Sequence, residues 1–204
     1  MKIPNVPGPK ETLADLAWLH PEIYRAFEYG IFKAKNHFAT ENLEHEASAF
    51  STLVRLHAKD YLRKKGLQAV EIEDVKLCGL SLKLDGYHIK MWKASDDGLP
   101  VPGKSEPKQE FYQQSLFNDG ERPEVLNLAV IWNINSNKDL SAIWLICPKY
   151  GDENSAEEYW NARIPDPSLA VVSSDLTPQS EDLPIGPKKE SEQVKKKKSG
   201  KEEG

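Results

Sequence analysis

With 204 residues, a net charge of −5 and two cysteines, this chain falls outside several classes of protein. The acidic excess argues against a general nucleic-acid binder, which normally has a basic face. Cys78 and Cys147 have no second cysteine or histidine at metal-ligand spacing, so neither a disulfide framework nor a zinc site is expected. The longest strictly apolar run, Ala142 to Cys147, is too short to span a membrane, so we expect a cytoplasmic protein without a membrane partner.

The N-terminal third predicts helices. After an irregular lead-in over residues 1–10, a short helix is expected from Thr12 to Leu19. Pro21 and Glu22 are typical of the first turn of a longer helix, because proline loses no hydrogen bond there and an acidic residue complements the helix dipole. Apolar residues at steps of three and four form its buried stripe: Ile23, Phe27, Ile31, Ala34 and Phe38.

A second helix is expected to take Thr40 as its N-cap and to stop at Gly66, behind the basic run Arg63–Lys65. The two helices then form an antiparallel pair. Gly30 interrupts the first of them, which costs about 1 kcal/mol in a helix interior unless the glycine lets another backbone approach.

From Val70 the apolar period changes from 3.6 to 2, which indicates strands. The alternation changes phase near Gly79, and a β-bulge there is the simplest explanation. Asp85-Gly86 is the strongest short-range hairpin signal. The strand after this turn has two faces, with Tyr87, Ile89 and Met91 on one and His88, Lys90 and Trp92 on the other.

A loop from Ser95 to Pro107 is expected next, followed by a short helical or extended segment from Gln109 to Phe117. Leu126–Trp132 and Leu140–Cys147 are nearly all apolar, which is typical of strands covered on both faces. The polar turn between them predicts a second hairpin. Glu158–Ile164 is expected to add an edge strand.

The predicted fold is a single α+β domain over residues 1–172, in which the N-terminal helical pair packs on an antiparallel sheet made of two β-hairpins. The tail, residues 173–204, has few large apolar residues and balanced charges, so we expect it to be disordered. Its run Lys195–Lys198 is either an electrostatic tether for nucleic acid or part of a solvated tail.

No catalytic residue, metal site or cofactor is expected, because the sequence has no GxSxG elbow, no GxxxxGK[ST] loop and no GxGxxG motif. The alternative is a divergent metal-dependent nuclease. Asp74-Val75-Lys76 has the D-x-K pattern of PD-(D/E)xK nucleases, and Glu44 or Glu46 would supply an acid from the preceding helix. No strand upstream of Asp74 carries the remaining acid of that pattern.

Aromatic and cationic side chains around Tyr87–Lys93 favour a binding function. Rings beside cations suit a protein interface, and they also suit stacking on single-stranded bases. The other interpretation is that Trp92 and Phe111 only cover the sheet beneath the loop. The candidate binding residues are His88, Lys90, Trp92, Lys93, Lys104, Lys108, Phe111, Tyr112, Gln113 and Gln114.

Five segments carry a family resemblance: DGYHIKMWKASDDGLPVPG, EFYQQSLF, LNLAVIWNIN, LICPK and ARIPDP. In order and spacing they are similar to a group of uncharacterised bacterial proteins. These are partners of helix-turn-helix and ImmA/IrrE-type regulators in mobile elements and toxin-antitoxin-like pairs. The resemblance covers residues 18–167 and carries over no catalytic residue. It implies a non-enzymatic, antitoxin-like protein whose partner is such a regulator.

Overall fold

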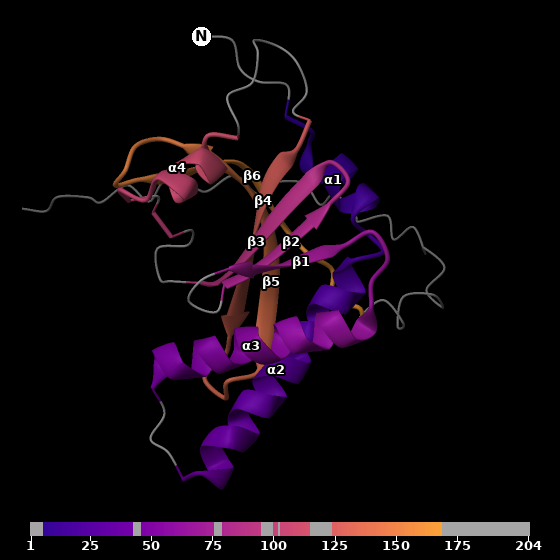
Figure 1. Ribbon diagram of the computed structural model, residues 1–204, viewed down its shortest axis with the longest axis vertical. Helices are drawn as coiled ribbons and strands as arrows, with labels where there is room; N and C mark the ends of the chain where they lie inside the picture. Colours follow the sequence, from indigo (N-terminus) through magenta and orange to yellow (C-terminus); the bar gives the residue numbers. More distant parts are fainter. Residues whose placement is uncertain are drawn as a thin grey trace, which may run out of the picture.

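Helices precede the strands along this chain, except for one that lies between two of them (Figure 1). The computed structural model describes residues 6–42, 46–75, 79–94, 100–101, 103–114 and 124–168. The helices are α1 (Pro9–Asp15), α2 (His20–Thr40), α3 (Ala47–Lys65) and α4 (Glu106–Tyr112). The strands are β1 (Glu71–Val75), β2 (Gly79–Leu84), β3 (Tyr87–Lys93), β4 (Leu126–Ile134), β5 (Leu140–Tyr150) and β6 (Ala156–Arg163).

The strands form one mixed sheet in chain order, β1-β2-β3-β4-β5-β6. Every neighbouring pair is antiparallel except β3 and β4, which run parallel. A tight turn cannot join parallel neighbours, so the chain crosses one face of the sheet between them, and α4 lies in that crossing. The predicted α+β class and both hairpins, β2–β3 and β4–β5, are confirmed. The purely antiparallel pairing is wrong, because β3 and β4 are parallel.

The β-bulge predicted at Gly79 is wrong, because the chain reverses there between two strands. β1 and β2 are separate antiparallel strands, with Val75 opposite Gly79. Ile72 lies opposite Leu82 and Glu73 opposite Ser81, so residues of the same parity share a face in both strands and the buried phase does not change. Residues 76–78, which connect the two strands, lie outside the described residues.

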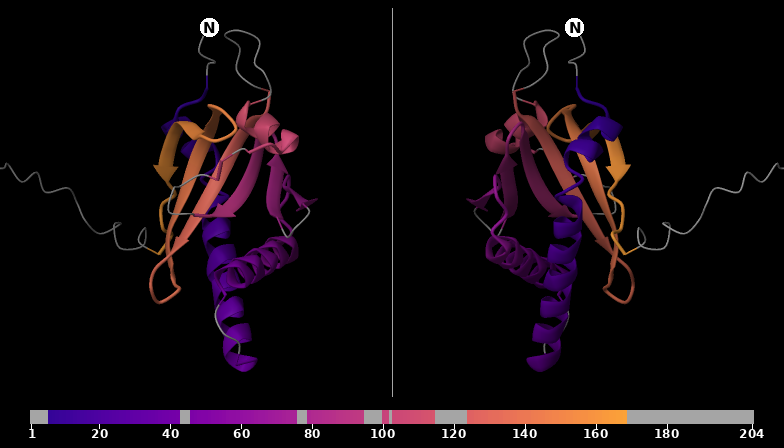
Figure 2. Two further views of the ribbon diagram at one scale, coloured as in Figure 1. Left: turned by 90° about the vertical axis from the view of Figure 1, so that its left-hand side faces the viewer. Right: turned by 90° about the vertical axis from the view of Figure 1, so that its right-hand side faces the viewer.

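Helices α2 and α3 cross closely at Gly30. A Cβ atom added to Gly30 would lie 2.4 Å from the carbonyl oxygen of Val54 in α3, so only glycine permits this approach. The crossing holds α2 and α3 as one layer against the sheet, and Figure 2 shows α2 extending past the ends of the strands.

The end of α3 is predicted correctly and its beginning is not. Gly66 ends the helix in the left-handed conformation, with φ 63°. Thr40 is the last residue of α2 instead of the N-cap of α3, which begins at Ala47. The apolar pattern of α2 continues to Phe38, and the helix continues through Thr40. Thr40 therefore lies in the last turn of α2 and is not the N-cap of α3.

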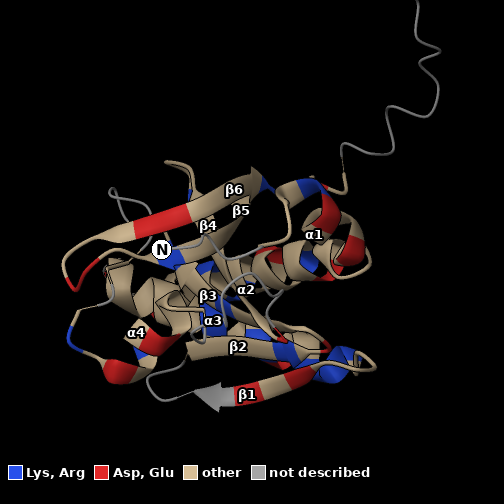
Figure 3. Cartoon of the chain, turned by 90° about the horizontal axis from the view of Figure 1, so that it is seen from above, with Lys and Arg blue, Asp and Glu red and all other residues tan. Residues whose placement is uncertain are grey.

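The other two helices lie on opposite sides of the sheet (Figure 3). The helix predicted from Thr12 to Leu19 forms as α1, three residues earlier. α4 begins at Glu106, inside the predicted loop, and ends at Tyr112, before the predicted end of that segment at Phe117. The edge strand predicted over Glu158–Ile164 forms as β6. Within the described residues, no helix combines the length and apolar character needed to cross a membrane. The tail predicted to be disordered lies outside them.

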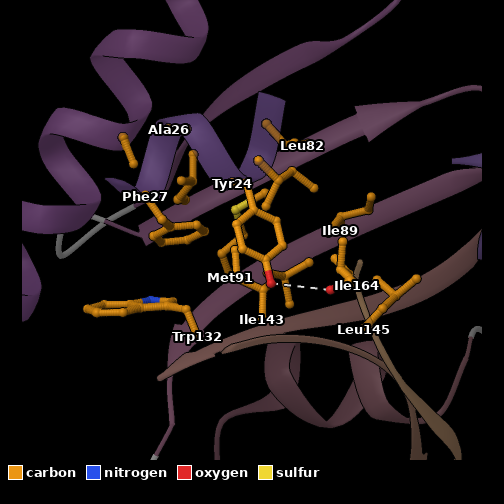
Figure 4. Close-up of a cluster of buried hydrophobic side chains, with 14 of the residues drawn as sticks. Tyr24, Ala26, Phe27, Leu82, Ile89, Met91, Trp132, Ile143, Leu145 and Ile164 are labelled. Atoms are coloured by element: carbon orange, nitrogen blue, oxygen red, sulfur yellow. Dashed lines mark hydrogen bonds between the residues drawn. The ribbon is translucent and has the colours of Figure 1, made fainter. Parts of the chain in front are cut away.

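The helix face of the sheet, which is the side covered by α2 and α3, holds the main apolar core (Figure 4). Phe27 of α2 stacks on Trp132 of β4 with ring centroids 5.3 Å apart. The Tyr24 hydroxyl donates a hydrogen bond to the carbonyl oxygen of Ile164 at 3.2 Å. Buried residues of the sheet on this face include Leu80, Leu82, Tyr87, Ile89, Met91, Leu128, Val130, Ile143 and Leu145.

Candidate functional site on the outer face of the sheet

Strand β3 has the two faces that its sequence predicts. Its odd-numbered residues from Tyr87 to Met91 are buried on the helix face, and the even-numbered ones are partly exposed on the opposite side, which we call the outer face. These partly exposed residues are His88, Lys90 and Trp92. The outer face is therefore the side of β3 on which contacts with another molecule can form.

Helix α4 covers one end of the outer face by packing Phe111 on β3. The Phe111 ring lies edge-on to His88 and Trp92, with centroids 5.4 and 5.6 Å away, and the Lys90 ammonium is 4.4 Å from its centroid. Phe111 is only 3% exposed and Tyr112 is fully buried. Phe111 therefore covers the sheet, as the second interpretation of the sequence has it, and both rings are removed from water.

The outer face of β1 to β3 carries paired polar groups, which we call the charged cluster: Glu73, Ser81, Lys83, His88 and Lys90. The Glu73 carboxylate accepts hydrogen bonds from Lys83 Nζ at 2.6 Å and Ser81 Oγ at 2.8 Å. Burial acts to raise the pKa of Glu73, but these hydrogen bonds outweigh it and hold that pKa below its ordinary value. The carboxylate is therefore kept in its charged form.

Lys90 and His88 are partly removed from water, whereas Lys83 is exposed. Burial is the main reason that the pKa of Lys90 lies below its ordinary value. Burial also lowers the pKa of His88, and the positive charge of Lys90 adds to that effect. His88 is therefore neutral near pH 7.

The charged cluster does not have the geometry of a Ser-His-acid relay. Ser81 Oγ and Glu73 Oε2 both contact the same ring nitrogen, His88 Nε2, at 2.9 and 3.2 Å. In a catalytic triad the serine and the acid contact opposite ring nitrogens. Ser81 is also fully buried. The three side chains satisfy one another's hydrogen bonds and present no accessible nucleophile.

A row of large side chains, which we call the tryptophan row, crosses the outer face next to the cluster. Strand pairing places Trp92 opposite Ile131, Ile131 opposite Trp144, and Trp144 opposite Arg163. Both tryptophans are partly exposed and pack against a small apolar cluster that is separate from the main core. Of the row, the sequence singled out only Trp92 as a binding residue, because the residues beside it depend on the register of distant strands.

The remaining candidate residues do not gather at one place. Lys104 is exposed in the loop before α4, and Gln113 is half-buried at the end of α4. Lys108 donates a hydrogen bond to the carbonyl oxygen of Val101 at 2.5 Å, and burial lowers its pKa. Lys93 lies at the end of β3 and shares the phase of the helix face. None of these residues contributes to the tryptophan row.

Gln114 joins α4 to the sheet. Its backbone has φ 54° and its side chain is fully buried. Its Nε2 donates to the carbonyl oxygens of Asn127 and Pro148 at 2.8 and 2.9 Å, and its Oε1 accepts from the Asn127 amide at 2.9 Å. These bonds hold the chain after α4 to β4 and β5, so Gln114 positions α4 on the outer face.

The structure does not test the nuclease alternative. Lys76 and Glu44 lie outside the described residues, as does the side chain of Asp74. Where the structure describes the chain, no group of three or more His, Cys, Asp and Glu residues is placed to hold a metal ion. Burial raises the pKa of the Cys147 thiol to about 12, so this cysteine stays protonated at neutral pH.

Comparisons with known proteins find no relative. No family model matches the chain, and searches of curated proteins and of solved structures find no match.

Proposed function

We propose that this protein is a non-enzymatic, regulatory protein-binding module whose partner docks on the outer face at the tryptophan row. The row is the observation that carries the proposal. Two partly exposed tryptophans flank Ile131 on three adjacent strands, and the exposed Arg163 ends the row. Tryptophan and arginine are enriched in binding hot spots, and the sheet holds them at a fixed spacing.

The charges around the row indicate the chemistry of the partner. Lys90 lies on the strand of Trp92, half-buried against the Phe111 ring, and Arg163 extends from β6. A carboxylate on the partner would stabilise the charged form of Lys90. We expect a partner that presents apolar side chains flanked by acidic residues. Regulators of the helix-turn-helix and ImmA/IrrE type are the first to test, since the sequence resemblance implies them.

Binding of the purified partner to the full chain tests the proposal. Replacing both tryptophans, Trp92→Ala with Trp144→Ala, should weaken binding at least about thirtyfold, as expected when hot-spot residues are removed. Trp18→Ala is the matched control. Trp18 is 49% exposed and follows α1, on the opposite side of the sheet from α4 (Figure 3). This variant should bind like the parent chain.

A second variant separates binding from folding. Trp92 contacts Phe111, so the double variant needs a thermal-unfolding measurement beside the binding assay. Arg163→Glu reverses the charge of an exposed side chain and should weaken binding. Its unfolding temperature is measured as well, because Arg163 donates a hydrogen bond to the carbonyl oxygen of Ser141 at 3.2 Å. Equal affinity of all variants for the partner would contradict the proposal. Loss of binding after nuclease treatment would identify nucleic acid as the ligand and contradict it as well.

A further inference from the structure

A groove of about 240 Å³ lies between α2 and the turn that joins β4 to β5. Its lining consists of Glu28, Ile31, Phe32 and Lys35 from α2 with Asp139 and Leu140 from the turn. Lys35 Nζ lies 2.6 Å from Asp139 Oδ1, so an ion pair ties the helix to the turn. Phe32 is 57% exposed, which makes it the most exposed large apolar side chain among the described residues.

After β6 the described chain runs towards this groove. Ile164 is buried in the core, and its carbonyl oxygen accepts a hydrogen bond from the Tyr24 hydroxyl. The Ile164 amide donates a hydrogen bond to the carbonyl oxygen of Ile143 at 2.9 Å, so the chain continues antiparallel to β5, towards Leu140. Leu140 lines the groove, and so does Glu28, which lies one turn beyond Tyr24 along α2.

We propose that the next apolar residues of the same chain, Leu169-Ala170-Val171-Val172, occupy the groove and cover Phe32. This run is the longest apolar stretch between residues 169 and 204. Phe32 lies about 6 Å along the helix axis from Glu28, and each extended residue spans about 3.3 Å, so the segment is long enough. Its side chains remove the Phe32 ring and Leu140 from water, which is the driving force for docking.

Hydrogen exchange of the full chain, followed by mass spectrometry, tests this inference. The amides of residues 170–172 should exchange at least tenfold more slowly than those of residues 190–200. In Phe32→Glu the two rates should become equal, because a carboxylate in the groove opposes an apolar segment. Leu56→Glu is the matched control, since Leu56 is an exposed apolar residue of α3 outside the groove, and it should keep the protection.

A change in the segment gives an independent result. Val171→Asp should abolish the protection of its neighbours. It should leave the fold intact, because the residues that line the groove and form the main core are unchanged. Fast exchange of residues 170–172 in the parent chain would overturn the inference, and so would protection that persists in Phe32→Glu. Protection that increases with protein concentration would assign the groove to a second copy and overturn it too.

Discussion

On the helix face, residues of β2 to β5 are buried against α2 and α3. On the outer face, the sheet carries the charged cluster, the tryptophan row and α4. Ile89 and Lys90 are neighbours in β3. The first is fully buried, and the second keeps its ammonium over an aromatic ring. Apolar burial therefore stabilises the helix face, while the outer face combines a smaller apolar cluster with polar groups that pair with one another.

The largest expected effect compares these two neighbours. Ile89→Ala removes buried methyl and methylene groups and should lower the free energy of unfolding by about 2–5 kcal/mol. Lys90→Ala loses one cation–π contact and should cost about 1 kcal/mol or less. Urea denaturation measures both. Equal losses would mean that the two faces contribute alike to stability, and the comparison would fail.

A second test concerns the helix layer. Gly30→Ala places a Cβ atom where the Val54 carbonyl lies, so α2 and α3 must separate, and we expect a loss of about 1–3 kcal/mol in urea denaturation. Gly8→Ala is the control, because a Cβ atom at Gly8 meets nothing within 4 Å. A harmless Gly30→Ala would show that the crossing can open without cost.

On the outer face, Gln114 should matter more for stability than its neighbour. Gln114→Ala leaves the buried amide of Asn127 without its acceptor and should cost about 1–3 kcal/mol. Gln113→Ala changes a half-buried side chain and should cost much less. Urea denaturation of the two variants gives the comparison, and equal losses would remove Gln114 as the anchor of α4.

The smallest effect is the pH dependence of the charged cluster. The pKa of His88 in the folded protein lies below 6.5, its value in the unfolded chain, so protons bind the unfolded chain more readily. The free energy of unfolding should therefore fall as the pH drops below 6.5. Glu73, whose pKa is lowered from 4.5, adds its own loss only at lower pH.

Histidine variants separate the contribution of His88 from that of the buried His20. His88→Gln should make the decline below pH 6.5 shallower, and so should His20→Gln in the helix layer, where burial also lowers the pKa. Chemical denaturation at a series of pH values measures the slope. An unchanged slope in His88→Gln would show that protonation of His88 does not change the stability of the folded protein.

Predictions from the sequence succeeded where a local pattern is sufficient. The Asp85-Gly86 turn, the alternation of β3 and the end of α3 at Gly66 each depend on a few adjacent residues. They failed where two local patterns look alike. The apolar residues before Gly79 suggested a change of phase, whereas the register keeps one phase across a reversal, and Thr40 is as acceptable in a last helical turn as at an N-cap.

The sequence by itself determined which segments are helices or strands and which side of β3 is apolar, because these follow from backbone geometry and the spacing of apolar residues. Only the tertiary structure decided that β3 and β4 are parallel, that Phe111 is buried, and that Trp92 and Trp144 share a row. Pairing between distant strands depends on how the whole sheet buries its faces, and a one-residue slip would turn either tryptophan to the opposite side.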